Sequence, residues 1–278
     1  VDLTLSNTSG LSIGDFKDVE VVVHTAARVH ITNDDASNPL AEFRKVNRDA
    51  TLVLARLAAE AKVKRFIFLS SIKVNGEITL PSKPFTPNDV HVPDDPYALS
   101  KYEAEQGLLA LVQETDMDVV IIRPPLVYGP GVKGNFSSMM KWMSKPVPLP
   151  FGAIHNQRSL VALDNLVSFI NLCIDLEKSS KASNQVLLIC DGEDVSTTEL
   201  LKKVEQALNF QSPSGKQALL LPVPVSIMMF FAKLLGKGDT ANRLFGCLQV
   251  DSSKTRKLLG WTPVVTIDEQ LAKIPKET

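Results

Sequence analysis

Four short runs of apolar, mostly β-branched residues recur along the chain, at residues 19–23, 65–69, 119–122 and 186–189. Near-continuous apolar runs of this length are typical of parallel strands that are covered on both faces. Helical periodicity fills two of the intervals between them. This alternation predicts an α/β fold with a doubly wound parallel sheet, in which ligands bind outside the carboxyl ends of the strands.

The first predicted helix runs from about Leu40 to Ala61, with apolar residues at every third or fourth position. Its predicted apolar stripe consists of Leu40, Phe43, Val46, Ala50, Leu54, Leu57 and Ala61. The second helix covers residues 96–112. After Pro130 the pattern loosens, because prolines at positions 146, 148 and 150 predict a loop and helices follow near residues 163–176 and 198–208. We expect a smaller, mostly helical lobe packed over the strand ends.

The composition is that of an ordinary globular protein and excludes several classes. Of 278 residues, 44% are hydrophobic. The net charge is −1, which argues against a protein whose main function is to bind nucleic acid. Three scattered cysteines fit a reducing compartment, so we expect a cytoplasmic protein. The most apolar stretch, residues 225–235, is about half of the roughly 20 residues that a membrane span needs, so no membrane insertion is expected. The histidines show no metal-ligand spacing, and no metal is expected.

The sharpest chemical signal is a tyrosine and a lysine at the start of the second helix. Asp95 is a suitable N-cap and Pro96 suits the first helical position, so Tyr97 begins the helix and Lys101 follows one turn later on the same face. A phenol is a poor base at neutral pH unless a neighbouring cation lowers its pKa. The spacing arises easily by chance, however, and a surface tyrosine beside a solvated lysine would look the same.

The residues at the ends of two predicted strands support a functional role for the Tyr97–Lys101 pair. Small residues, Ala26 and Ala27, follow the first strand, and Ser70 and Ser71 end the second strand 26 residues before Tyr97. Small residues let a cofactor approach the backbone closely, although a tight turn needs them too. A serine hydroxyl at this edge is positioned to hydrogen-bond the substrate oxygen that the tyrosine acts on.

Taken together, these residues resemble the extended short-chain dehydrogenase/reductase family, in its sugar-nucleotide epimerase branch, whose members are similar to UDP-glucose 4-epimerase. The matching segments are residues 23–27, 46–47, 68–71 and 74–76, Tyr97 with Lys101, residues 123–131, residues 158–161 with Asp164, and residues 251–254 and 259–263. They cover nearly the whole chain in the family's order. The resemblance implies a Rossmann-like domain over residues 1–130 and about 156–192, and a sugar-nucleotide-binding lobe over residues 131–155 and 193–278.

The resemblance also implies roles for individual residues. Ser71, Tyr97 and Lys101 match the catalytic set. The residues expected to bind the cofactor, NAD with NADP as the alternative, are Ala26, Ala27, Asn47, Ser70, Tyr97, Lys101 and Pro124. The residues expected to bind the substrate are Ser71, Asn135 at a helix start, Leu149, Pro150 and Phe151 beside the base, and Arg158 and Arg243 at the diphosphate.

Two departures from the family pattern stand out. Asn75 replaces a commoner tyrosine and is expected to alter a pocket wall. The glycine-rich loop between the family's first strand and helix would precede Val1, so we expect that the sequence begins partway into a longer protein.

The expected reaction is NAD(P)-dependent 4-epimerisation of a UDP-sugar, of the N-acetylhexosamine type, through a transient 4-keto intermediate. Ile72 and Lys73 after Ser71 disfavour a 4,6-dehydratase, which usually carries Thr-Asp-Glu there. An NAD(P)H-dependent reductase of a UDP-4-keto-6-deoxy-N-acetylhexosamine is the alternative, and a non-catalytic dinucleotide-binding relative is a weaker one because tyrosine and lysine are both retained. A homodimer is expected, formed by the helices at residues 40–61 and 96–112.

Overall fold

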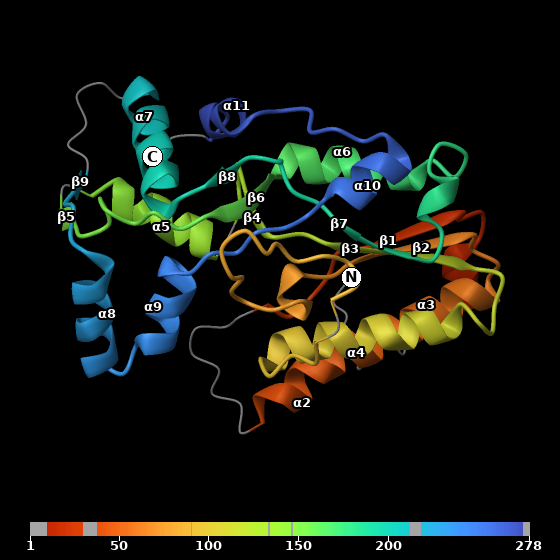
Figure 1. The fold of residues 1–278 in the computed structure, drawn as a ribbon. Helices are drawn as coiled ribbons and strands as arrows, with labels where there is room; N and C mark the ends of the chain where they lie inside the picture. Colours follow the sequence, from red (N-terminus) through yellow and green to blue (C-terminus); the bar gives the residue numbers. More distant parts are fainter. Residues whose placement is uncertain are drawn as a thin grey trace.

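A computed structural model describes residues 10–29, 38–89, 91–132, 134–145, 147–211 and 218–274. Its main sheet is parallel, with strand order β1-β2-β3-β7 (Figure 1). The strands are β1 (Val21–His24), β2 (Arg65–Leu69), β3 (Asp118–Arg123) and β7 (Gln185–Leu188). They match the four predicted apolar runs within two residues. All four run in one direction, so their carboxyl ends meet at a single edge.

Helices cover both faces of this sheet (Figure 1). On one face lie α3 (Ala50–Glu60) and α4 (Pro96–Leu111), and on the other lie α6 (Leu163–Ile174) and α10 (Ser253–Leu259). Alternate strand residues point to opposite faces. Phe66, Phe68, Val119 and Ile121 therefore join the core under α3 and α4, whereas Ile67, Val120 and Ile122 join a second core with Phe169 and Trp261. The predicted α/β class with a doubly covered sheet is confirmed.

The first predicted helix is one continuous helical segment with an unusual turn inside it. It consists of α2 (Pro39–Phe43), the π-helical segment η2 (Arg44–Asp49) and α3. The predicted apolar stripe is only partly right. The fully buried positions are mainly Phe43, Asn47, Ala50, Thr51, Ala55 and Ala58, while Leu40, Val46, Leu54 and Leu57 are half-buried. Small residues face inward because α3 approaches α4 closely: a Cβ at Gly107 would lie 2.6 Å from Leu52.

The remaining elements form a second body beside the sheet (Figure 1). Strands β4 (Leu126–Tyr128), β6 (Arg158–Ala162) and β8 (Asp194–Val195) make one small sheet, and β5 (Pro148–Leu149) pairs with β9 (Leu219–Leu220) in another. The helices are α5 (Asn135–Met143), α7 (Thr197–Gln211), α8 (Val225–Leu234), α9 (Gly238–Phe245) and α11 (Ile267–Ala272). Short 3-10 turns are η1 (Ile13–Phe16), η3 (Ile72–Val74) and η4 (Ser180–Ala182).

One expectation about this part of the chain changes. The loop predicted around the prolines contains the short strand β5, and Pro146 lies outside the described residues. The expected division into two domains stays a prediction. None of the helices within the described ranges is both long and apolar enough to cross a membrane.

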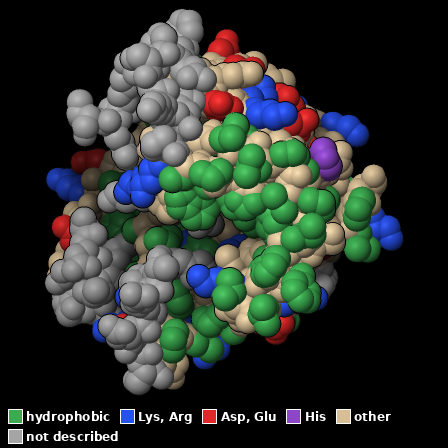
Figure 2. Space-filling view, turned by 90° about the vertical axis from the view of Figure 1, so that its left-hand side faces the viewer, with side chains coloured by type: hydrophobic (Ala, Val, Ile, Leu, Met, Phe, Trp, Pro, Cys, Tyr) green, Lys and Arg blue, Asp and Glu red, His purple; other side chains and the backbone are tan. Residues whose placement is uncertain are grey.

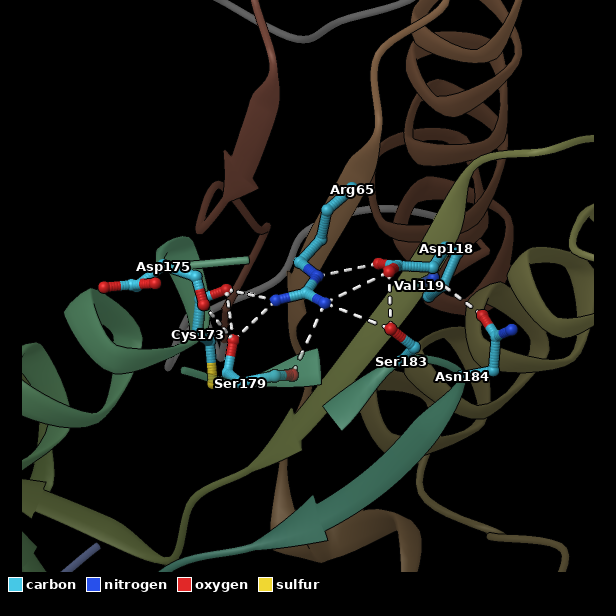
Figure 3. A network of polar contacts seen from close by, with 8 residues as sticks. All are labelled: Arg65, Asp118, Val119, Cys173, Asp175, Ser179, Ser183 and Asn184. Carbon is cyan, nitrogen blue, oxygen red and sulfur yellow. Dashed lines mark hydrogen bonds and ion pairs between the residues drawn. The ribbon is translucent and has the colours of Figure 1, made fainter. Parts of the chain in front are cut away.

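A buried arginine at the amino end of β2 joins this strand to β3 and to the end of α6 (Figure 3). Arg65 is 1% exposed, and its guanidinium donates to Asp118 Oδ1 at 2.7 Å, to the Cys173 carbonyl at 2.8 Å and to Ser179 Oγ at 2.6 Å. Ser183 Oγ accepts a further bond at 3.1 Å. The charge is therefore buried with hydrogen-bonding partners, as a buried ion requires. These bonds fasten the end of α6 to β2 and β3.

Candidate active site

The carboxyl ends of β2 and β3 fix the serine pair in place. The backbone N–H of Ser70 donates to the Ile122 carbonyl at 2.8 Å, and that of Ile72 donates to the Pro124 carbonyl at 3.0 Å. Ser71 lies between these two bonds, in extended conformation, and caps the short turn η3. Pro124 itself is buried beneath this edge. Ser71 is consequently held at the rim of the sheet with its hydroxyl near the start of α4.

Tyr97 meets Ser71 because helix α4 begins as the sequence predicts. The Asp95 carboxylate accepts from the Ala98 N–H at 2.9 Å, and Pro96 is the first helical residue. The Tyr97 side chain hydrogen-bonds Ser71 and packs edge-on against Phe43 with ring centroids 6.0 Å apart. Burial raises the pKa of the Tyr97 phenol, the Ser71 bond opposes that rise, and the Asp95 charge adds to it. The two predicted hydroxyl groups thus form one unit.

Lys101 lies one turn further along α4 and is almost completely enclosed, with 1% of its surface exposed. Its ammonium donates to the Leu69 carbonyl at 2.8 Å and lies 4.3 Å from the centroid of the Phe68 ring. Burial lowers the pKa of Lys101 to about 7, although the Glu105 carboxylate favours the charged form. An ammonium has three hydrogens and Leu69 accepts one, so hydroxyl groups of a ligand suit the rest.

Asn47 joins three elements at the base of the site. Its side-chain oxygen accepts from the Arg28 N–H at 2.8 Å, and its amide group donates to the Arg28 carbonyl and to Ser100 Oγ, both at 3.0 Å. Ser100 Oγ in turn donates to the Tyr97 carbonyl at 2.7 Å. Both amide hydrogens of Asn47 therefore have protein acceptors. The structure places Asn47 as a support between the loop after β1 and α4, and its direct contact with the cofactor stays a prediction.

A buried ion pair behind the serines escaped the sequence reasoning. Arg123, at the end of β3, donates to the two Glu105 carboxylate oxygens at 2.9 and 2.5 Å, and Ser70 Oγ donates to Glu105 at 2.5 Å. Glu105 is 0% exposed and follows Lys101 by four residues on α4. One feature of the sequence could have revealed this pair, namely a charged residue, Glu105, on the buried face of a predicted helix. Ser70, which was expected to bind the cofactor, thus donates its hydroxyl hydrogen to this ion pair.

Asn75 belongs to the same buried network as Arg123 and Glu105. Its oxygen accepts from Arg123 Nη1 at 2.9 Å and its amide donates to the Thr86 carbonyl at 2.8 Å. Asn75 is 4% exposed and extends the buried polar network, and its expected effect on a pocket wall stays a prediction.

His24 is a second buried group without a predicted role. It ends β1, and its Nε2 lies 2.9 Å from Thr51 Oγ1 on α3. Burial, followed by the charge of Lys101, lowers the pKa of His24 to about 4. His24 is therefore neutral at physiological pH, and this spares the site a second cation next to Lys101.

The two arginines expected at the diphosphate lie beside each other. Arg158 Nη1 donates to the Arg243 carbonyl at 2.7 Å, and Arg243 Nε pairs with Glu77 at 2.7 Å. Lys73 lies 2.9 Å from Glu77 and 3.7 Å from Asp95, the N-cap of α4. A line of charges therefore runs from α9 to the helix that carries Tyr97.

The other predicted site residues occupy the positions that their elements give them. Ala26 is exposed and Ala27 half-buried just after β1, and Leu149 in β5 is half-buried. Phe151 packs against Trp142 with ring centroids 6.3 Å apart. Asn135 is the first residue of α5, and its side chain lies outside the described part of the structure. Contacts of these residues with a ligand stay predictions.

Comparison with known proteins agrees with this geometry. The model of the NAD dependent epimerase/dehydratase family matches residues 1–189. A UDP-glucose 4-epimerase of Vibrio cholerae is 51% identical over 254 residues, which cover 91% of this chain and 75% of that protein. An N-acetyl-alpha-D-glucosaminyl-diphospho-ditrans,octacis-undecaprenol 4-epimerase of Escherichia coli O157:H7 is 27% identical over 224 residues, covering 78% and 65%.

Solved structures share the fold. A UDP-glucose 4-epimerase of Thermotoga maritima with UDP-glucose has a TM-score of 0.72 at 24% identity, covering 97% of this chain and 81% of that one. A UDP-glucuronic acid 4-epimerase of Bacillus cereus in complex with NAD has a TM-score of 0.71 at 20% identity, covering 96% and 77%. The family match, the half-identical relative and the Ser71–Tyr97–Lys101 geometry lead to one conclusion: the chain belongs to the NAD dependent epimerase/dehydratase family of extended short-chain dehydrogenases/reductases.

Proposed function

We propose that the protein catalyses the NAD-dependent 4-epimerisation of a UDP-sugar, and that the sugar is of the N-acetylhexosamine type. The observation that carries the reaction is the Ser71–Tyr97 hydrogen bond beside the buried Lys101 ammonium at the strand ends. The half-identical relative named for UDP-glucose supports the UDP-sugar. The N-acetyl group has weaker support, from the 27% identical relative whose name includes an N-acetylglucosaminyl group.

The described residues fit the nicotinamide half of NAD, the cofactor of this family. A buried ammonium with one carbonyl partner needs further acceptors, which the hydroxyl groups of a ribose supply. The small side chains of Ala26 and Ala27 leave the backbone after β1 accessible. A glycine-rich loop for the pyrophosphate is not found within the described ranges. We therefore assign the ribose to Lys101 and Tyr97, and assign no residue to the pyrophosphate.

Bound NAD supplies a hydride acceptor and donor for the sugar carbon. The protein's own contribution is proton transfer at the 4-hydroxyl oxygen. Tyr97 takes that proton as a base and returns it as an acid after the keto sugar has turned over. Burial raises the pKa of the Tyr97 phenol, and its hydrogen bond with Ser71 lowers it. We assign the electrostatic stabilisation of the phenolate to the charged form of Lys101, which lies one turn further along α4.

The second body would hold the nucleotide. Arg243 is 45% exposed at its side chain, so it remains accessible to a diphosphate even though it pairs with Glu77. Guanidinium groups bind phosphate oxygens well. Arg158 supports it through the Arg243 carbonyl, and Leu149 and Phe151 would flank the uracil. A homodimer formed by the helices at residues 40–61 and 96–112 remains part of the proposal, to be tested by sedimentation velocity.

The test is to incubate the purified protein separately with UDP-N-acetylglucosamine, UDP-glucose and a UDP-4-keto-6-deoxy-N-acetylhexosamine. We expect the first to reach equilibrium with its 4-epimer without net consumption of cofactor, and faster than the second. Faster turnover of UDP-glucose would contradict the N-acetylhexosamine assignment alone. Stoichiometric use of reduced cofactor with the keto sugar, and no epimer from either UDP-sugar, would replace the epimerase by the reductase.

A further inference from the structure

Helix α8 exposes a continuous apolar stripe. Ile227, Phe230, Phe231, Leu234 and Leu235 follow each other at intervals of three, one, three and one residues, which places them on one helical face. We refer to these five residues as the α8 face. Their exposed fractions lie between 47% and 73%, although such a stripe usually faces a protein core.

The opposite side of α8 is apolar as well. Val225, Met228, Met229 and Ala232 are half-buried, and the helix packs against α9. None of the ten residues of α8, all of them described, is buried. A helix with apolar residues on two opposite sides is normally enclosed by protein on both. One side of α8 therefore has its protein partner, while the α8 face is open.

The apolar surface continues beyond the helix. Strand β9, which leads into α8, pairs with β5, and Leu219 of β9 is 64% exposed. Trp142 and Val147, at the end of α5 and just before β5, are 46% and 41% exposed. Figure 2 shows hydrophobic side chains gathered over this end of the molecule. Extended exposed apolar patches usually mark interaction surfaces.

The two chain segments that carry this surface bear basic charges only, and Asp239 follows them in α9. The two segments that form it, residues 134–153 and 218–238, contain no Asp or Glu and four lysines, Lys141, Lys145, Lys233 and Lys237. All four lysines are exposed. Basic residues beside exposed Phe, Leu and Trp are the pattern of helices that lie in the interface of an anionic bilayer.

We propose that the α8 face, with its continuation on α5 and β9, docks onto an anionic lipid surface. The helix lies in the plane of the interface with its apolar side chains between the headgroups, and the lysines contact the lipid phosphates. A second copy of the chain is a poorer occupant, because a two-fold contact places the same surface on both subunits and sets lysines against lysines. This docking goes beyond the proposed reaction and does not depend on which sugar is used.

The experiment is co-sedimentation of the purified protein with vesicles. One set consists of phosphatidylcholine with a third of phosphatidylglycerol, and the other of phosphatidylcholine alone. We expect binding to the anionic set only, with a loss of binding at high salt. Phe230→Glu and Leu234→Glu should each lower the bound fraction at least tenfold. Val264→Glu, at a 60% exposed position in the loop before α11, is the matched control and should bind as the wild type does.

The charge contribution is tested by the double variant Lys233→Gln, Lys237→Gln, which keeps the α8 face and should bind anionic vesicles severalfold less. Circular dichroism and thermal melting of each variant establish that it is folded. No binding by the wild type, or equal binding by Phe230→Glu, would overturn the proposal. So would a dimer in sedimentation velocity that Phe230→Glu splits while the wild type ignores vesicles, since the occupant would then be a second copy.

Discussion

Replacing Glu105 by glutamine tests how far the site depends on its buried ion pair. Glu105 is 0% exposed and accepts two bonds from Arg123 and one from Ser70. Glutamine keeps the shape but turns one acceptor into an NH₂ group that faces an arginine N–H. The arginine is then left buried without its counter-charge, and breaking such a pair typically costs about 3–5 kcal/mol. That is a large share of a total stability of about 5–15 kcal/mol.

Glu103, two residues earlier on α4, provides a matched control. It also pairs with arginines, Arg44 and Arg48, but its side chain is 21% exposed and those of its partners 35% and 33%. Partly exposed pairs contribute about 1 kcal/mol or less because solvent screens them. Glu103→Gln and Glu105→Gln are therefore the same chemical change on one helix, in two environments.

The assay is urea unfolding followed by circular dichroism, with the midpoint and the slope fitted for wild type and both variants. We expect Glu105→Gln to lower the free energy of unfolding by about 3 kcal/mol or more and Glu103→Gln by at most about 1 kcal/mol. Similar losses in the two variants, or a loss below about 1 kcal/mol for Glu105→Gln, would show that burial does not set the strength of this pair.

Three further predictions concern the reaction and its pH dependence. Tyr97→Phe should lower kcat by a factor of about 100 or more while UDP binding by calorimetry is retained, and Tyr102→Phe on the same helix should leave kcat near the wild-type value. The pKa of Lys101 is lowered to about 7, so its cation is lost as pH rises through 7. NAD affinity of the free enzyme should therefore fall between pH 6 and pH 8.5, and a Lys101→Met variant should bind weakly at both values. The pKa of His24 is lowered from 6.5 to about 4, so between these two pH values the unfolded chain binds a proton at this histidine and the folded chain does not. Stability should be complete above pH 6.5 and fall by about 3 kcal/mol as pH drops through 4; a His24→Asn variant whose urea midpoint falls just as steeply would contradict this.

The sequence was most informative where local signals and tertiary structure agree. The four strands were predictable because each is a short apolar run covered on both faces, and Tyr97 because Asp95 and Pro96 fix the start of its helix. The ion pair of Arg123 and Glu105 was missed because its partners are 18 residues apart and meet only when α4 packs on the sheet. The hydrogen bonds of Asn75 to Arg123 and Thr86 were missed for the same reason, because both partners are brought to it only by the tertiary fold.

The sequence patterns were least informative about which face of a helix points to the core. The first helix was predicted as one regular helix. Phe43 and Ala50 of its predicted stripe are buried, but Leu54 and Leu57 are only half-buried, whereas Ala55 and Ala58 lie fully inside. Residues 225–235 were judged only by length, as too short to span a membrane. Helical spacing shows that their apolar side chains share a face, but it does not tell whether that face points to the core or to solvent.

The π-helical segment η2 has a consequence for comparing this chain with its relatives. A π-helix closes its hydrogen bonds five residues apart, one more than an α-helix, so η2 holds one residue more than a regular turn would. Removing that extra residue would leave a regular α-helix with the flanking turns in the same phase, whereas removing a residue from the regular helix α3 would rotate everything on one side of the gap by about 100° about the helix axis. We therefore expect that a relative with a regular first helix aligns with a single-residue gap at this turn, and that a single deletion is tolerated better here than within α3.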